Sequence, residues 1–304
     1  MIDVHCHLNF HAFAKDYDEC IHEAKRVGVN YIINVGTKLD SSAKAVELAQ
    51  KYDDLYAIVG VHPHHADKKD LGIENDEVRG DASGGTHQGG LSANEGALVE
   101  GNEGQDPDGW LKNLEALAKQ PKVVAIGEIG MDYFRYQSNG VVDPTLQKEI
   151  FEEQIALAHR VNLPIQIHNR HAGKDVLEIL KHHQSLLKRD NPGMFHCFAG
   201  DIEVLRGALD LGFYIGFDGN ITYPGLAPGE STSLIDIANA TPMDRILTET
   251  DSPFLTPIPY RGSRNMPSHV ILVNAFLAQL KDIPEEDMAH QTEQNAKRLF
   301  GIAG

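Results

Sequence analysis

Eight ionisable side chains in this 304-residue chain follow short apolar runs, and their types suit metal binding. Imidazole and carboxylate groups together are ligands for Zn, Mn or Fe, and for Mg where carboxylates and water dominate. In His5-Cys6-His7 the two imidazoles are two residues apart, so both project from one face of a strand. The eight residues are His5, His7, His62, His64, Glu128, His168, His196 and Asp251.

Six of these residues form the predicted metal-ligand set: His5, His7, Glu128, His168, His196 and Asp251. Taken singly, Glu128 could be a structural ion-pair partner and Asp251 could cap a helix. Gathered at one rim, such groups would be costly to desolvate without a compensating cation. Four histidines and two carboxylates exceed the needs of one open catalytic ion, but they suit two ions about 3.5–4 Å apart and bridged by a carboxylate. We therefore predict two divalent ions (Mg, Mn or Zn) as cofactors.

The apolar runs that precede these residues predict eight β-strands. They are rich in β-branched or aromatic residues, and several are almost continuously apolar, which is typical of parallel strands buried on both faces. The predicted strands are 2–5, 31–36, 55–62, 123–130, 164–168, 193–196, 213–217 and 246–251.

Amphipathic segments between the runs predict helices at 16–27, 144–161, 174–187 and 201–211. The stretch 268–300 is expected to form two more helices that close an outer ring. Strands alternating with helices predict an α/β fold, a (β/α)8 TIM barrel that occupies residues 1–304 as a single domain. In such a barrel the ends of all strands converge on one rim, where the active sites of barrel enzymes lie.

One segment, 72–109, interrupts the alternation between the third strand and the helix expected near Trp110. It is rich in Gly, Asn, Asp and Glu, and Arg79 is its only Lys or Arg. Such a composition buries too little apolar surface to offset the entropy of ordering. We interpret it as an acidic, Gly-rich loop inserted in the barrel. A tolerated surface insertion is the favoured interpretation, and a specificity loop or lid is the alternative.

The net charge of −17 argues against a broad electrostatic grip on duplex nucleic acid. It leaves a phosphate-bearing substrate open, because bound cations can invert the local field. No stretch approaches the roughly 20 apolar residues that span a bilayer, and the first residues lack a secretory pattern. We expect a cytoplasmic monomer with no membrane partner.

The three cysteines, Cys6, Cys20 and Cys197, form no CxxC pair, and their odd number makes a disulfide framework improbable. Cys6 and Cys197 adjoin predicted ligands, so a thiolate ligand is conceivable. Neighbouring residues of a strand point to opposite faces, however. If the histidines point inward, these cysteines point away and are buried structural residues.

Six segments together resemble the successive motifs of the TatD-type metal-dependent deoxyribonucleases, a family of the amidohydrolase superfamily. The segments are 3–8 (DVHCHL), 60–64 (GVHPH), 127–133 (GEIGMDY), 167–170 (IHNR), 196–200 (HCFAG) and 249–253 (ETDSP). They occur in the family's order over nearly the whole chain, and 259–265 (PYRGSRN) resembles the loop that follows the eighth strand.

This resemblance implies a barrel phosphodiesterase that cleaves DNA, often as a 3′→5′ exonuclease, here expected to act on single-stranded DNA. It also implies that His5, His7 and Asp251 hold one ion and that Glu128 bridges it to the other. His168 and His196 would hold that second ion, and His62 and His64 match positions near the substrate phosphate. Two departures are the long acidic segment 72–109 and Met266, which stands where the family commonly has a glutamate.

The ligand set suggests a mechanism in which Asp251 and Glu128 are the catalytic residues. Asp251 would accept the proton of the attacking water, and the ions would neutralise charge on the phosphoryl oxygens. Four arginines that follow strand ends are candidates for phosphate contacts, because a guanidinium matches phosphate oxygens; solvated surface arginine is the alternative for each. They are Arg135, Arg170, Arg261 and Arg264.

Two other functions stay open. A two-ion barrel also cleaves esters, and some relatives of this family are considered D-aminoacyl-tRNA deacylases. Amidase-type relatives often bridge their ions with a modified lysine on the fourth strand, where this chain has Glu128, which favours the phosphodiesterase. A non-catalytic scaffold is the third hypothesis, and the complete ligand set argues against it.

Overall fold

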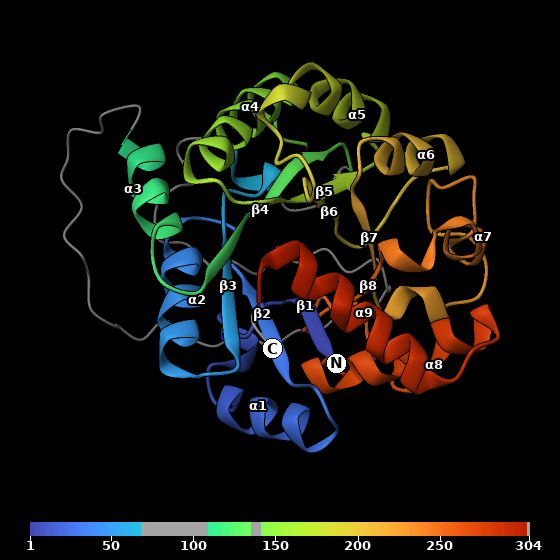
Figure 1. The fold of residues 1–304 in the computed structure, drawn as a ribbon. Helices are drawn as coiled ribbons and strands as arrows, with labels where there is room; N and C mark the ends of the chain where they lie inside the picture. The colour runs from blue at the N-terminus through green and yellow to red at the C-terminus, as the bar shows by residue number, and fades with distance from the viewer. Residues whose placement is uncertain (68–108, 135–140, 303–304) are drawn as a thin grey trace.

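Eight parallel strands in the order β1 to β8 form the centre of the protein (Figure 1). The computed structural model describes residues 1–67, 109–134 and 141–302. The strands are β1 (Ile2–Cys6), β2 (Tyr31–Val35), β3 (Leu55–Val59), β4 (Val123–Asp132), β5 (Ile165–Arg170), β6 (Gly193–Phe195), β7 (Tyr214–Phe217) and β8 (Ile246–Thr248). The predicted (β/α)8 barrel is confirmed.

The barrel closes where β1 meets the segment that follows β8. The amide of Asp251 donates to the carbonyl of His5 at 2.9 Å, and the amide of His7 donates to the carbonyl of Ser252 at 2.8 Å. Asp251 therefore lies in a turn beyond β8, with a positive φ of 52°, and not in a strand as the pattern predicted. Likewise β3 ends at Val59, so that His62 and His64 lie beyond it, His64 in the short 3-10 helix η2 (Pro63–His65).

The helices lie around the strands, as Figure 1 shows. They are α1 (Tyr17–Arg26), α2 (Leu39–Lys51), α3 (Gly109–Ala118), α4 (Pro144–Val161), α5 (Gly173–His182), α6 (Ile202–Asp210), α7 (Leu234–Ala240), α8 (Val270–Lys281) and α9 (Glu285–Phe300). The predicted bounds of α4 are confirmed. Asp143 caps this helix by accepting from the amide of Thr145, and Pro144 supplies the fixed φ suited to the first turn.

The last helix differs from the expectation that both C-terminal helices would belong to the outer ring. In Figure 1 α9 crosses in front of the strands. Its apolar face packs into one end of the barrel interior, where it completes a cluster that we call the barrel floor. The floor comprises Ile2, Val4, Ile33, Val35, Ile58, Val124, Met194, Tyr214 and Leu247 with Ala296, Leu299 and Phe300 of α9.

Two register shifts turn key side chains toward the interior. On β1 the pairing with β2 shifts between Asp3 and Cys6, and on β4 the pairing with β5 shifts between Ile126 and Ile129. An extra residue in one strand interrupts the alternation of side chains and re-aims a side chain next to it. His5 and Glu128 lie within these two shifts.

The cysteine interpretation holds for Cys6, which is buried in the apolar layer between the barrel and its helices. Cys20 is buried in the same layer, and Cys197 is partly exposed beside Asn220. All three are free thiols. None of the candidate metal-ligand groups among the described residues contains a cysteine.

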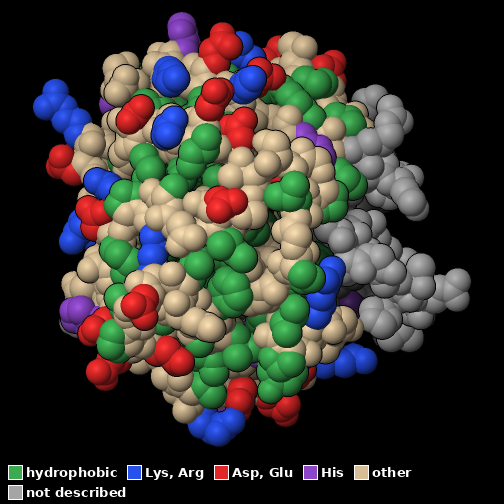
Figure 2. Space-filling view, turned by 90° about the vertical axis from the view of Figure 1, so that its right-hand side faces the viewer, with side chains coloured by type: hydrophobic (Ala, Val, Ile, Leu, Met, Phe, Trp, Pro, Cys, Tyr) green, Lys and Arg blue, Asp and Glu red, His purple; other side chains and the backbone are tan. Residues whose placement is uncertain are grey.

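The outer surface mixes charges. On the face shown in Figure 2, acidic and basic side chains lie around a central area of hydrophobic side chains, and neither sign dominates. Among the described helices, none is long and apolar enough to cross a membrane. The predicted acidic loop falls between η2 and α3, and its residues up to position 108 lie outside the described part of the chain.

Candidate metal centre

Glu128 lies at the centre of the converging side chains, and its two oxygens face different partners. It is 4% exposed. Its Oε1 lies 2.6 Å from Nδ1 of His168 and 3.4 Å from Nε2 of His196. Its Oε2 lies 3.7 Å from Nε2 of His5. One carboxylate thus faces two separate sets of imidazoles.

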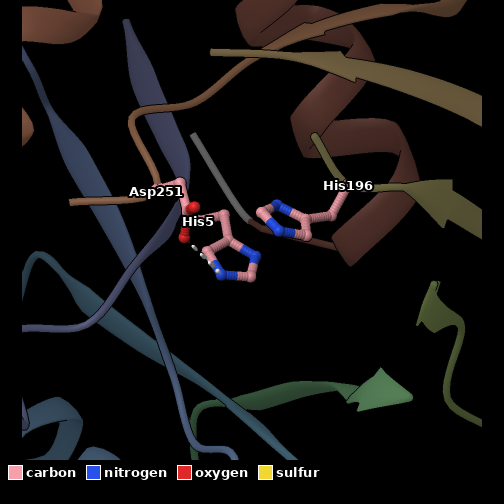
Figure 3. Close-up of side chains that lie close together, drawn as sticks. All are labelled: His5, His196 and Asp251. Carbon is pink, nitrogen blue, oxygen red and sulfur yellow. Dashed lines mark ion pairs between the residues drawn. The ribbon is translucent and has the colours of Figure 1, made fainter. Parts of the chain in front are cut away.

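The first set contains His5, His7 and Asp251. Nε2 of His5 and Nε2 of His7 are 3.0 Å apart, and Oδ1 of Asp251 lies 3.5 Å from the former and 3.3 Å from the latter. Figure 3 shows Asp251 directed at the His5 ring, with His196 stacked beside it at a centroid distance of 3.6 Å. Nδ1 of His7 must donate to the carbonyl of Val35 at 2.9 Å, so its Nε2 presents a lone pair to the site.

The second set contains His168 and His196, and each ring is held from behind by a buried carboxylate. Nε2 of His168 lies 3.0 Å from Oδ2 of Asp132, and Nδ1 of His196 lies 3.3 Å from Oε1 of Glu249. Asp132 and Glu249 are both fully buried. Neither was among the residues predicted for the site.

His62 reaches the centre as a hydrogen-bond donor. Its Nδ1 accepts the amide hydrogen of His64 at 3.1 Å, so in the neutral ring Nε2 carries the proton. That Nε2 lies 3.4 Å from Oε1 of Glu128. His62 and His64 also belong to candidate metal groups by distance, but this tautomer leaves Nε2 of His62 without a lone pair for an ion. His64 instead faces Asp132, with Nε2 at 3.1 Å from Oδ2.

Burial and mutual contact shift the proton affinities of these groups in opposite directions. Burial lowers the pKa of His62 to about 3 and, with His196 nearby, holds the pKa of His5 well below its usual range. Burial would raise the pKa of Glu128, but the neighbouring rings of His62 and His196 outweigh it and hold this pKa well below its usual range. Glu128 is therefore a carboxylate, and the rings of His5 and His62 beside it are neutral near pH 7.

In the second set, the histidine pKa values are raised instead of lowered. Burial opposes the charged form of His168, but hydrogen bonds to Asp132 and Glu128 prevail and raise its pKa to about 9. Burial is likewise outweighed at His196, whose pKa rises to about 10 because of Glu249 and Glu128. Two imidazolium charges thus occupy the place where cations are expected, and bound ions would displace those protons.

The centre fits divalent ions on its own chemistry. Donor atoms of His5, His7 and Glu128, and again of His5, His196 and Asp251, lie within 4.8 Å of one another. They are imidazole nitrogens and carboxylate oxygens, the usual ligands of Zn, Mn and Mg. All six predicted ligands meet in this one place.

The four arginines predicted to contact phosphate differ in their surroundings. Arg170 lies over the Phe134 ring at 3.8 Å, and Arg261 lies over the Tyr223 ring at 4.0 Å. Arg264 donates to Asp16 at 2.6 and 2.9 Å and to the carbonyl of Ala12, so it joins two parts of the chain. Arg135 lies outside the described residues.

Two glutamines on α4 hydrogen-bond the backbone beside site residues, and their spacing of seven residues is the one sequence signal that could have indicated this. Gln154 accepts from the amide of Val61 at 2.7 Å and donates to its carbonyl at 2.9 Å, directly before His62. Gln147 makes the same pair of bonds to Asp132, at 2.7 and 2.9 Å. Residues seven apart lie on one helical face, which is why a single helix can hold both positions.

Comparison with known proteins agrees with this geometry. The family model described as TatD related DNase matches residues 2–301. The chain belongs to this family. It is similar to the uncharacterized metal-dependent hydrolase YabD of Bacillus subtilis, with 37% identity over 99% of each chain. It is also similar to the hydrolase YcfH of Escherichia coli, with 32% identity over 99% of this chain and 96% of that one.

Solved structures extend the likeness to the fold. The crystal structure of YjjV, a TatD homolog of Escherichia coli, superposes with a TM-score of 0.78 at 29% identity and covers 100% of this chain and 98% of its own. A TatD family hydrolase of Entamoeba histolytica shares the fold, with a TM-score of 0.75 at 22% identity, covering 99% of this chain and 97% of its own. The family predicted from the motifs is confirmed, and this chain is a metal-dependent hydrolase of the TatD family.

Proposed function

We propose that this TatD-family hydrolase cleaves phosphodiester bonds of DNA with two divalent ions, as a 3′→5′ exonuclease on single strands. The observation that carries the proposal is the division of the Glu128 carboxylate, with Oε1 toward His168 and His196 and Oε2 toward His5. A bridging carboxylate between two ions is typical of enzymes that displace a phosphoryl leaving group in line. The family description, TatD related DNase, supports the choice of substrate.

The proposed ligands follow the two sets. His5, His7 and Asp251 would hold one ion, His168 and His196 the other, and Glu128 would bridge them. Each proposed ligand nitrogen is the one that faces the centre: Nε2 in His5, His7 and His196, and Nδ1 in His168. The ions, when bound, would lower the pKa of a water molecule and offset charge on the phosphoryl oxygens.

The chain's own groups would do the remaining work. Asp251 is the proposed proton acceptor for the attacking water, since a carboxylate near its water can act as a general base. Its side chain is 14% exposed, so water and substrate can reach it. His62 would donate its Nε2 hydrogen to a phosphate oxygen, because its pKa of about 3 keeps the ring neutral and its tautomer fixed near pH 7.

The rest of the DNA strand would bind around the metal centre, at the end of the barrel opposite the floor, which we call the mouth. Arg170 is the last residue of β5 and Arg261 lies in the segment after β8, and each guanidinium lies over an aromatic ring. The planar fork of guanidinium donors matches phosphate oxygens. Arg135 remains a predicted contact, and Arg264 is not assigned to the substrate because Asp16 engages it.

The test compares substrates and ends. Protein stripped with chelator would be given Mg, Mn or Zn and single-stranded DNA labelled at either its 5′ or its 3′ end, with duplex DNA and an aminoacyl ester in parallel. We expect metal-dependent shortening from the 3′ end of single strands, absent in Glu128→Gln. A folded, metal-loaded protein that leaves all DNA intact but cleaves the ester would replace the nuclease with the deacylase alternative.

A further inference from the structure

We infer that Asp132 and Glu249 are positioning residues that hold His168 and His196 in opposite ring tautomers. With these tautomers, Nδ1 of His168 and Nε2 of His196 would be the nitrogens that hold the second ion. The inference rests on the proposed ligand assignment. It adds that two buried carboxylates, on β4 and just after β8, determine how this half of the site binds metal.

Asp132 faces two histidine rings and a backbone amide. Its Oδ2 lies 3.0 Å from Nε2 of His168 and 3.1 Å from Nε2 of His64, and its Oδ1 accepts from the amide of Phe134 at 2.8 Å. Gln147 fixes the backbone of Asp132 on both sides through its amide and carbonyl. A carboxylate held this firmly keeps a hydrogen on Nε2 of His168, so that in the neutral ring, the form that would bind metal, the lone pair is on Nδ1.

Glu249 imposes the opposite tautomer on His196. Its Oε1 accepts from the amide of Cys197 at 2.5 Å and lies 3.3 Å from Nδ1 of His196, without a hydrogen bond between the two in this structure. A carboxylate oxygen this close to Nδ1 favours the tautomer that carries the hydrogen there. The barrel interior makes room for this carboxylate, since a Cβ on Gly216 would lie only 2.5 Å from Glu249 Oε1. Its Oε2 is buried without a hydrogen-bond partner among the described residues.

In the other half of the site, no carboxylate of the described residues lies behind a ligand ring. His7 is oriented by the backbone carbonyl of Val35, and Nδ1 of His5 has no hydrogen-bond partner in the described structure. A carboxylate behind a ligand imidazole fixes its tautomer and raises its basicity, and its loss typically weakens metal binding about 10–100-fold. Loss of Asp132 or Glu249 should therefore lower the affinity for one ion and leave the affinity for the other unchanged.

The two carboxylates predict different outcomes for amide substitution. In Asp132→Asn, an amide oxygen that keeps the bond from the Phe134 amide turns the NH2 group toward Nε2 of His168, where the carboxylate oxygen was the acceptor. In Glu249→Gln the amide oxygen can keep both donors while the NH2 takes the place of the unpartnered Oε2. Glu249→Gln is thus the conservative rescue, and Glu249→Leu removes the acceptor altogether.

The experiment measures metal binding and tautomers as well as DNA cleavage. Zn and Co affinities would be obtained by chelator competition, with metal content counted per chain, and tautomers by long-range 1H–15N spectra of the 15N-histidine-labelled Zn protein. We expect hydrogens on Nε2 of His168 and Nδ1 of His196. One of two ions should bind about 10–100-fold more weakly in Asp132→Asn and Glu249→Leu. Glu249→Gln and the exposed control Asp236→Asn should stay near the unchanged protein.

The outcomes separate the inference from the proposed function. Unaltered affinity for both ions in Asp132→Asn and Glu249→Leu, or the reverse tautomers in the unchanged protein, would overturn the inference alone. The tautomer spectra need no variant, so a variant that fails to fold does not prevent a decision. Metal binding and tautomers as expected, without any cleavage of DNA, would overturn the nuclease and keep the inference. A protein that binds no divalent ion would overturn both.

Discussion

The two ends of the barrel interior have opposite chemistry although the same strands build both. At the floor, Ile33, Val35 and Leu247 meet Leu299 and Phe300 of α9 in an apolar cluster. At the mouth, imidazoles and carboxylates meet around Glu128 with little exposure to solvent. The chain at β8 contributes to both, with Leu247 of the strand in the floor and Glu249, just after the strand, near the mouth.

This difference shows how the protein separates stability from chemistry. The floor gains from every apolar contact and needs no partner for a polar group. The mouth concentrates groups whose burial is unfavourable unless charges, hydrogen bonds or bound ions compensate. Changes at the floor should therefore act on the free energy of unfolding, and changes at the mouth on ion binding and turnover.

The largest effect is expected from Glu128→Gln, which removes the charge between the two imidazole sets and nearly keeps the shape. Cleavage of single-stranded DNA should fall at least about a thousandfold, within the range for groups that act on the reacting atoms. Metal content per chain should fall with it. His182→Gln, at an exposed residue, serves as the control. Full turnover of Glu128→Gln with both ions retained would contradict the bridging role of Glu128.

At the floor, Leu299→Ala should destabilise the protein by about 2–5 kcal/mol, because it leaves a cavity in an apolar cluster. Leu299 is 1% exposed. Urea unfolding measures this change in the free energy of unfolding. The control is Leu226→Ala, at a residue that is 56% exposed, which should change that free energy by no more than about 0.5 kcal/mol. Cleavage per folded molecule should remain. If Leu299→Ala instead reduced metal affinity without affecting unfolding, the separation of the two ends would be wrong.

The mouth should also give the metal-free protein a pH-dependent stability. His168 has a folded pKa of about 9, above its usual value, so its protonation stabilises the fold fully below about pH 6.5. That stabilisation is lost as the pH rises through about 9, and the pKa of about 10 at His196 extends the loss. Urea midpoints in chelator should decline from pH 7 to 10, and less so in His168→Gln. A flat profile would show that these rings are neutral when the fold forms.

The smallest effect is expected outside both regions, from Arg264→Met. Its pair with Asp16 is about one-third exposed on both sides, so its loss should cost about 1 kcal/mol or less. Cleavage should not change, because Arg264 is bound to Asp16 and Ala12. A large rise in KM for DNA, with normal unfolding, would restore Arg264 as a phosphate contact and extend the functional surface beyond the mouth.

The sequence alone determined the barrel, the family and the meeting of the six predicted ligands. Those conclusions depend on local patterns: apolar runs, helical periodicity such as that of α4, and short motifs at strand ends. Chain connectivity in a parallel barrel then brings the strand ends to one rim whatever the details of packing. No such pattern tests the acidic segment 72–109, which stays a prediction.

Only the tertiary structure decided how those ligands are aimed and supported. The register shifts at His5 and Glu128 depend on pairing with neighbouring strands, which no single segment reports. Asp132 meets His168 from the adjacent strand, Glu249 after β8 meets His196 after β6, and α9 fills the floor instead of joining the ring. These contacts join residues far apart in the chain, and a buried carboxylate reveals its partner only once the fold has formed.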